Sequence, residues 1–172
     1  ITAVTNTGVI RAAQTLVQLL EGADDVASVD IVDWPAFKLR GYMHDVGRSF
    51  ISIDELVKQV EKFSRFKVNT FHWHLTENQA WRFEVKAYPE LTSSESMTRF
   101  PGQYYTQEDC KRLMEVAKKH GVIVIPEIDM PGHSEAFERA MSFDMQSEQG
   151  KVVLKKVLDE VVEVFADAPY IH

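Results

Sequence analysis

Two acidic residues and a histidine follow the most apolar stretch of the sequence. Residues 122–125 form an uninterrupted apolar run, and Glu127, Asp129 and His133 come soon after it. A proline-glycine pair between them predicts a turn. An aspartate beside a histidine can fix the tautomer and the orientation of the imidazole. The cluster is therefore a candidate functional site, although a hydrogen-bond network that only braces the turn is the alternative.

Two histidines lie two residues apart in a second polar cluster, at His72 and His74, with Glu77 just beyond them. Residues 68–75 alternate in polarity as a strand does, so both imidazoles project to the same face. Imidazole is a common zinc ligand, and His72, His74 and Glu127 together would suit a metal-dependent hydrolase. A polar, hydrogen-bonded interior is the alternative interpretation.

A third cluster contains two arginines, Arg40 and Arg48, on either side of Asp45. A guanidinium is a planar fork of donors, which suits paired sugar hydroxyls or a carboxylate. For Arg48 the ordinary alternative is a salt bridge to Asp45. Arg40 stands close to the start of the strand predicted over residues 39–46, so it faces a site only if that strand ends near it.

The elements that must position these clusters alternate between strand and helix. Strands are predicted at 39–46, 68–75, 122–125 and 170–172, and helices at 53–63, 106–118, 134–141 and 151–166. This order predicts a parallel sheet with right-handed crossovers, in which active sites lie at the carboxyl ends of the strands. The pattern fits half of an eight-stranded barrel and a small open sheet equally well. An earlier helix over 8–20 and a short strand over 29–32 read as the tail of a preceding αβ unit.

Composition narrows the choice of partner. The 172 residues carry a formal net charge of −7, which argues against nucleic acid or an anionic membrane as the main partner. The single cysteine, Cys110, excludes an intrachain disulfide. The adjacent acidic residues Asp159 and Glu160 fall within an amphipathic helical pattern and are predicted to face solvent.

Several ordered motifs together resemble one family, the family-20 glycoside hydrolases or β-N-acetylhexosaminidases. The resemblance covers residues 1–172 and implies an α/β fold, namely the first half of a (βα)8 TIM barrel. Residues 1–33 would be the end of an upstream αβ domain with its linker, and residues 34–172 the truncated first half of the catalytic barrel. The motifs are Arg40-Gly41, Asp45-x-x-Arg48, residues 69–82, Tyr88-Pro89-x-Leu91-Thr92 and Pro126 to His133.

The resemblance also implies a reaction. Family members remove terminal N-acetylglucosamine or N-acetylgalactosamine from glycans, and they retain the anomeric configuration by substrate-assisted catalysis. The substrate's own acetamido oxygen attacks the anomeric carbon, which gives the nucleophile a large effective molarity. A glutamate protonates the leaving oxygen, and the aspartate before it orients the acetamido group. No metal or other cofactor is implied.

Carried over residue by residue, the resemblance assigns binding and support roles in this chain. Arg40 resembles the arginine that grips the terminal sugar, and Asp129 and His133 resemble the pair that supports the catalytic acid. Glu77 resembles a further support residue, acting on His133. It stands where the family usually has aspartate, so its side chain is one methylene longer.

The catalytic Asp-Glu pair itself is expected after His172, so this chain should contain no catalytic residue and be inactive as a fragment. A half barrel would also leave strand edges and apolar faces uncovered, which predicts self-association. A non-catalytic carbohydrate-binding or scaffold domain is the remaining alternative.

Overall fold

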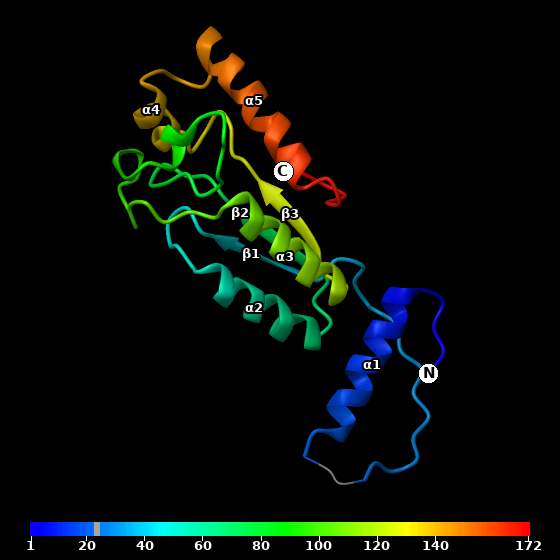
Figure 1. Ribbon diagram of the computed structural model, residues 1–172. Helices are drawn as coiled ribbons and strands as arrows, with labels where there is room; N and C mark the ends of the chain where they lie inside the picture. Colours follow the sequence, from blue (N-terminus) through cyan, green and yellow to red (C-terminus); the bar gives the residue numbers. More distant parts are fainter. Residues whose placement is uncertain (23–24) are drawn as a thin grey trace.

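Three parallel strands organise the chain. The computed structural model describes residues 1–22 and 25–172. Strands β1 (Gly41–Asp45), β2 (Thr70–His74) and β3 (Ile123–Glu127) form one parallel sheet in the order β1-β2-β3. Helix α2 (Ile53–Arg65) connects the first two strands, and α3 (Gln107–Lys119) precedes the third, as Figure 1 shows. The predicted alternation of strand and helix in a parallel sheet is confirmed for these elements.

The remaining elements lie around this sheet. After β2 the chain forms two short 3-10 helices, η1 (Pro89–Thr92) and η2 (Ser94–Ser96), and after β3 it forms α4 (Glu135–Met141) and α5 (Glu148–Val164). Helix α1 (Asn6–Leu20) lies at the end of the sheet where the strands begin (Figure 1). No helix among the described residues is long and apolar enough to cross a membrane.

Two predicted strands turn out differently. Residues 29–32 are not a strand, because their backbone has no strand partner in the described part of the chain, and Val29 and Val32 are exposed. The predicted strand at 170–172 is reduced to one residue that pairs with β3. The His172 N–H donates to the Pro126 carbonyl at 2.9 Å, and the Ile128 N–H donates to the His172 carbonyl at 3.1 Å. These bonds flank Glu127 and place His172 beside it as a parallel neighbour does.

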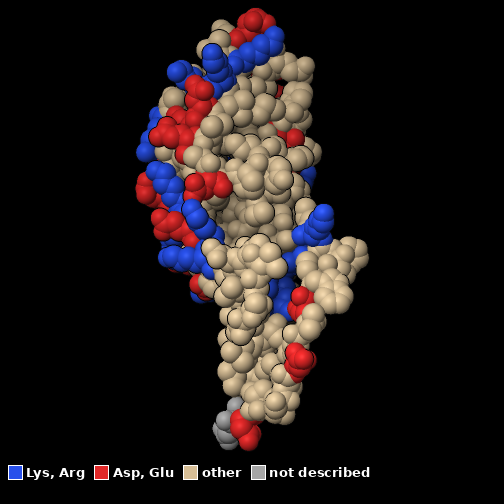
Figure 2. Space-filling model, turned by 90° about the vertical axis from the view of Figure 1, so that its right-hand side faces the viewer, with Lys and Arg blue, Asp and Glu red and all other residues tan. Residues whose placement is uncertain are grey.

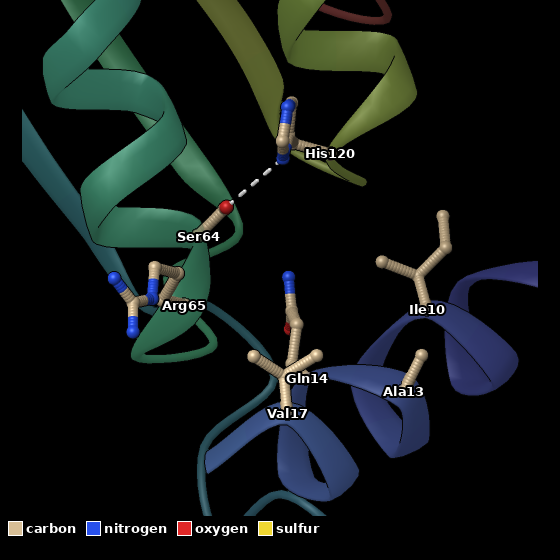
Figure 3. Close-up of a pocket in the computed structure, with 7 residues that line it drawn as sticks. All are labelled: Ile10, Ala13, Gln14, Val17, Ser64, Arg65 and His120. Carbon is tan, nitrogen blue, oxygen red and sulfur yellow. Dashed lines mark hydrogen bonds between the residues drawn. The ribbon is translucent and has the colours of Figure 1, made fainter. Parts of the chain in front are cut away.

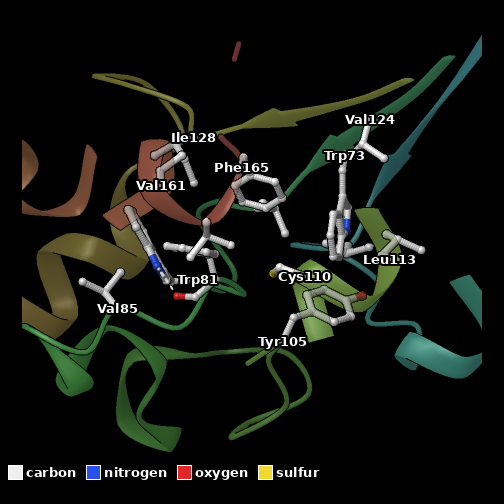
Figure 4. Close-up of a cluster of buried hydrophobic side chains, with 14 of the residues drawn as sticks. Trp73, Trp81, Val85, Tyr105, Cys110, Leu113, Val124, Ile128, Val161 and Phe165 are labelled. Atoms are coloured by element: carbon white, nitrogen blue, oxygen red, sulfur yellow. Dashed lines mark hydrogen bonds between the residues drawn. The ribbon is translucent and has the colours of Figure 1, made fainter. Parts of the chain in front are cut away.

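One face of the sheet packs into the hydrophobic core. Phe71 and Trp73 of β2 are fully buried and point toward the helices, as the alternation of residues 68–75 predicts. Trp73 makes an edge contact with Phe165 just after α5, with ring centroids 6.3 Å apart, and Figure 4 shows Cys110 and Leu113 of α3 in the same cluster. His72 and His74 consequently project to the other face.

Glu160 corrects the expectation that the acidic pair in α5 only faces solvent. Its carboxylate accepts the N–H groups of Lys86 and Ala87 at 2.8 and 2.9 Å and the side-chain amide of Gln107 at 2.6 Å. It therefore ties α5 to the loop before η1 and to α3. Asp159 is exposed, as predicted.

Two polar side chains of helix α1 bind backbone carbonyls next to the sheet. Arg11 donates to the carbonyl of Gly121 at 2.5 Å, and Gln18 donates to that of Arg65 at 2.6 Å. A cavity of about 290 Å³ remains between α1 and the ends of α2 and α3, where Ser64 and His120 lie 3.3 Å apart (Figure 3). Figure 2 shows that the narrow end of the molecule, where α1 lies, carries few charged groups. Apolar side chains exposed there are Val9, Leu16, Val17, Leu20, Val29, Ile31 and Val32.

Candidate active site

The carboxyl ends of the three strands bring the polar clusters of the sequence together. Asp45 of β1, His74 of β2 and Glu127 of β3 lie in one row of the strand register. Glu77 follows in the turn after β2, and His133 lies in the turn after β3, with its ring contacting Glu77. Parallel strands end at the same edge of a sheet, so residues distant in the sequence converge here.

Glu77 is the centre of this network. Its side chain is fully buried, with 0% exposed, and each carboxylate oxygen has two close partners. Oε1 accepts the Asn78 N–H at 2.8 Å and Nδ1 of His133 at 2.6 Å, while Oε2 lies 3.2 Å from Nε2 of His74 and 2.7 Å from the Arg48 guanidinium. Burial alone would raise the pKa of Glu77. The hydrogen bonds from Asn78, His133 and His74 outweigh burial and hold this pKa below its ordinary value.

His74 lies between two carboxylates. Its Nε2 faces Glu77, and its Nδ1 is 2.9 Å from Oε1 of Glu127, close enough for an ion pair but without hydrogen-bond alignment. Burial pushes the pKa of His74 down, but the contacts with Glu127, Glu77 and Asp45 more than compensate and raise it. The raised pKa favours the imidazolium, which balances part of the surrounding negative charge.

Arg48 is the guanidinium that the structure places at this edge. It forms the expected salt bridge with Asp45 at 2.5 Å and a second one with Glu77 at 2.7 Å. Contacts with Arg48 outweigh burial and lower the pKa of Asp45. Gly47 makes this arrangement possible, because a Cβ there would collide with the Cβ of Glu77. The Arg48 side chain remains 46% exposed, so part of its donor fork is open to a ligand.

Arg40 is not brought into the cluster. It precedes the first residue of β1 and lies at the opposite end of the strand from Asp45. Its guanidinium donates to the carbonyls of Lys67 at 2.8 Å and Phe37 at 2.6 Å. This position corrects the expectation that Arg40 faces the site, since the strand runs on for five residues after it. The spacing of Asp45 and Arg48 was the sequence signal for the arginine at this edge.

His133 has a different close partner from the one expected from its sequence neighbours. Its Nε2 is 4.0 Å from Asp129, too far for a hydrogen bond, whereas its Nδ1 contacts Glu77. The backbone at His133 adopts a left-handed φ of 52°, uncommon outside glycine. Asp129 is held through its N–H, which donates to the Thr76 hydroxyl at 2.9 Å. Glu77, Asp129 and His133 thus lie in one neighbourhood, with Glu77 as the orienting carboxylate.

Arg82 is a structural contributor that the sequence did not single out. Its guanidinium is buried and forms no ion pair among the described residues, because backbone carbonyls surround it. Burial lowers the pKa of Arg82 to about 10. The carbonyls of Val46 and Gly47 bind it at 3.0 and 3.2 Å, which fixes the turn that carries Arg48. On its other side lies the loop after η2, whose acceptors are the carbonyls of Arg99, Phe100 and Gln103.

A parallel α/β sheet with acidic, imidazole and guanidinium groups at its carboxyl edge has the organisation of an α/β enzyme. Comparison with known proteins identifies the family of enzymes. Residues 37–151 match the model of the glycosyl hydrolase family 20 catalytic domain. The chain therefore belongs to glycosyl hydrolase family 20, which confirms the family predicted from the motifs.

Individual relatives agree with this assignment. The chain is 43% identical to a β-hexosaminidase of Porphyromonas gingivalis over 145 residues, covering 75% of this chain and 18% of the relative. It is 36% identical to a β-hexosaminidase of Vibrio furnissii over 151 residues, covering 78% of this chain and 25% of the relative. The crystal structure of a β-N-acetylhexosaminidase from Bacteroides fragilis superposes with a TM-score of 0.89 at 36% identity, covering 99% of this chain and 39% of that one. The chain thus spans about a fifth to a quarter of the length of these curated relatives.

Proposed function

We propose that this chain supplies sugar-binding and supporting side chains to a retaining β-N-acetylhexosaminidase that removes terminal N-acetylglucosamine or N-acetylgalactosamine from glycans. The observation that carries the proposal is the buried Glu77 carboxylate, which joins Arg48 to His133 at the carboxyl edge of the sheet. In this proposal β1, β2 and β3 are the first strands of a (βα)8 barrel formed by residues 34–172 with further chain, and residues 1–33 belong to a preceding αβ domain.

The reaction follows the substrate-assisted scheme of this family. The acetamido oxygen of the substrate forms a bond to the anomeric carbon while the glycosidic bond breaks, and an acid protonates the departing oxygen. Water then opens the cyclic intermediate with retention of configuration. The network of this chain does not carry out the bond changes. It holds the sugar and the groups around the acid in a fixed geometry, which supplies much of the benefit of an intramolecular nucleophile.

His133 has a defined proton arrangement in this scheme. The low pKa of Glu77 keeps its carboxylate ionised, so the imidazole donates from Nδ1 to Glu77. In the neutral ring Nε2 is then an acceptor that points away from Glu77. It is free to accept a hydrogen bond from the acid or from the substrate. Asp129, 4.0 Å from Nε2, would add negative charge beside it.

We assign the sugar contact to Arg48. Its partly exposed fork can donate to two adjacent hydroxyls, and its ion pairs with Asp45 and Glu77 limit its motion. Arg40 is unsuited to this role because backbone carbonyls at the other end of the strand hold its guanidinium.

The acid and its aspartate partner are assigned to residues outside this chain. The sequence contains two adjacent Asp-Glu pairs, at residues 54–55 and 159–160. Asp54 and Glu55 form exposed salt bridges with Arg112 and Lys58, and Glu160 holds backbone amides in the loop before η1. Neither pair joins the Glu77 network. The 172-residue polypeptide should therefore release no nitrophenol from nitrophenyl N-acetylglucosaminide, and measurable release would contradict this assignment.

A chimera tests the proposed function directly. The matched segment of the Porphyromonas gingivalis relative would be replaced by the corresponding segment of this chain, and hydrolysis of nitrophenyl N-acetylglucosaminide and N-acetylgalactosaminide measured. We expect an active hybrid, with activity lost in the Glu77→Gln and His133→Ala hybrids. The matched control is His120→Ala, a histidine near the opposite end of the sheet, which should retain activity. A folded but inactive parent hybrid, or full activity in the His133→Ala hybrid, would overturn the proposal.

A further inference from the structure

Three side chains converge beside the Glu77 network, and one of them, Glu127, also contacts His74 of that network through its Oε1. His72 projects from β2, Glu127 from the end of β3, and His172 from the segment next to β3. One ligand atom from each lies within 4.8 Å of the other two. We propose that His72, Glu127 and His172 form a binding site for a divalent transition-metal ion, with Zn²⁺ as the best fit. This site goes beyond the proposed glycosidase function, which uses no metal.

The backbone fixes the relative positions of these three residues. His72 and Glu127 belong to adjacent parallel strands, and β2 holds its neighbour through a continuous ladder of paired residues. His172 is placed beside Glu127 by its two backbone hydrogen bonds with Pro126 and Ile128. The rings of His72 and His172 are 5.1 Å apart between centroids. The site therefore requires side-chain rotation rather than movement of the sheet.

The atoms that would bind the ion lack ordinary hydrogen bonds. Nε2 of His72 and Oε2 of Glu127 are buried, and within residues 1–22 and 25–172 neither has an aligned hydrogen-bond partner. The two atoms instead lie in direct contact with each other, and Nδ1 of His172 is 3.5 Å from the other oxygen of Glu127. Glu127 has a side chain only 6% exposed, so its carboxylate cannot rely on water. A cation between these atoms would satisfy all three at once.

The neighbouring acidic groups distinguish this cluster from the rest of the edge. Glu77 is already saturated by Asn78, His133, His74 and Arg48. Two other groups of side chains that could hold a metal ion include His74, and an ion there would compete with the contact between His74 and Glu77. The edge nonetheless carries a surplus of negative charge, because four carboxylates share it with the Arg48 guanidinium and the His74 imidazolium. The carboxylates are Asp45, Glu77, Glu127 and Asp129.

The donor set determines which metal fits. Two imidazole nitrogens and one carboxylate leave a fourth position open, a set that zinc accepts in tetrahedral sites. Calcium and magnesium prefer oxygen ligands, so the histidines disfavour them. The His172 side chain is 67% exposed, which gives an ion a route from solvent to Glu127.

Calorimetric titration of the chelator-treated 172-residue chain with ZnCl₂ tests the site. We expect one ion per chain and a visible absorption band of tetrahedral type when Co²⁺ is used instead. His72→Ala and His172→Ala should each weaken binding by at least about tenfold, because loss of even an outer-sphere partner costs that much. His120→Ala should bind as the parent does, and MgCl₂ should give no binding heat.

The titration still tests the metal site if His72→Ala folds poorly. His172 is exposed, so His172→Ala should keep the parent's circular dichroism spectrum and melting curve and isolates the ligand effect. Absence of stoichiometric Zn²⁺ binding, or binding unchanged in His172→Ala, would overturn the proposal. Neither result bears on hydrolysis by the chimera, so failure of the metal site and failure of the glycosidase proposal are separable.

Discussion

Replacing Arg82 by methionine should destabilise the chain while leaving its apolar stem in place. The guanidinium is buried and donates to five backbone carbonyls, two of them in the turn before Arg48. The acceptors at Arg99, Phe100 and Gln103 belong to exposed residues and can turn to water once the donor is removed. Those at Val46 and Gly47 belong to buried residues and would lose a partner.

The expected magnitude follows from the two acceptors that remain buried. A hydrogen bond to a charged group contributes about 1.5–3 kcal/mol, which gives roughly 3–6 kcal/mol for the pair. Removing a buried charge returns part of this, so we expect the free energy of unfolding to fall by about 3 kcal/mol. Lysine has three donors in place of five, and Arg82→Lys should lie between the parent and Arg82→Met.

Urea unfolding followed by tryptophan fluorescence measures the change, and amide hydrogen exchange localises it. We expect faster exchange at Gly47 and Arg48 and in the loop 97–103. Arg112→Met is the control, because Arg112 forms an exposed salt bridge with Asp54, and its removal should cost less than about 1 kcal/mol. If Arg82→Met stays within about 1 kcal/mol of the parent, Arg82 does not hold the turn as described.

Four further outcomes follow from the same contacts. The folded-state pKa of Glu77 is lowered, so its contacts stabilise the fold above the ordinary value of 4.5 and this contribution is lost as the pH falls through the folded pKa. The urea midpoint of the parent should therefore fall more steeply on acidification than that of Glu77→Gln. Gly47→Ala should cost about 1–3 kcal/mol by overpacking against Glu77 and should shift the ring resonances of His133, whereas unchanged resonances would contradict the close approach. Glu160→Ala should lower stability by about 1–3 kcal/mol and Asp159→Ala by no more than about 0.5 kcal/mol, and equal effects would show that Glu160 only faces solvent. Because β1 has an unpaired edge in the described residues, sedimentation should show association that increases with concentration, and a monodisperse monomer would contradict it.

The periodicity of the sequence was sufficient to predict those features of the fold that depend only on nearby residues. The alternation of residues 68–75 correctly separated Phe71 and Trp73 from His72 and His74, because side-chain direction in a strand depends only on position. The apolar run before Glu127 correctly predicted strand β3. Residues 29–32 also carry three apolar side chains, but they have no strand partner in the described part of the chain, and a strand needs a partner for its hydrogen bonds.

The partners within the site were harder to predict because they join distant segments. Asp129 and His133 are four residues apart, which suggested a pair, whereas the family resemblance indicated Glu77 as the support of His133. In the structure, His133 contacts Glu77 in the turn after β2. The bounds of β1 were needed to decide which arginine lies at the site, because Arg40 precedes the strand and Arg48 follows it. No local pattern identifies the carbonyls around Arg82, because backbone acceptors exist at every residue.

The glutamate at position 77, where the family resemblance leads one to expect aspartate, is explained by its surroundings. A longer side chain carries its carboxylate farther from the turn after β2, and the four close partners show that the added reach leaves no acceptor unsatisfied. The missing Cβ of Gly47 leaves space for the Cβ of Glu77, so the turn after β1 lies directly against this residue. Arg82 fixes that turn through the carbonyls of Val46 and Gly47. The position of Arg48 and the orientation of His133 therefore depend on one buried carboxylate, and a change on either side of it should be transmitted to the other.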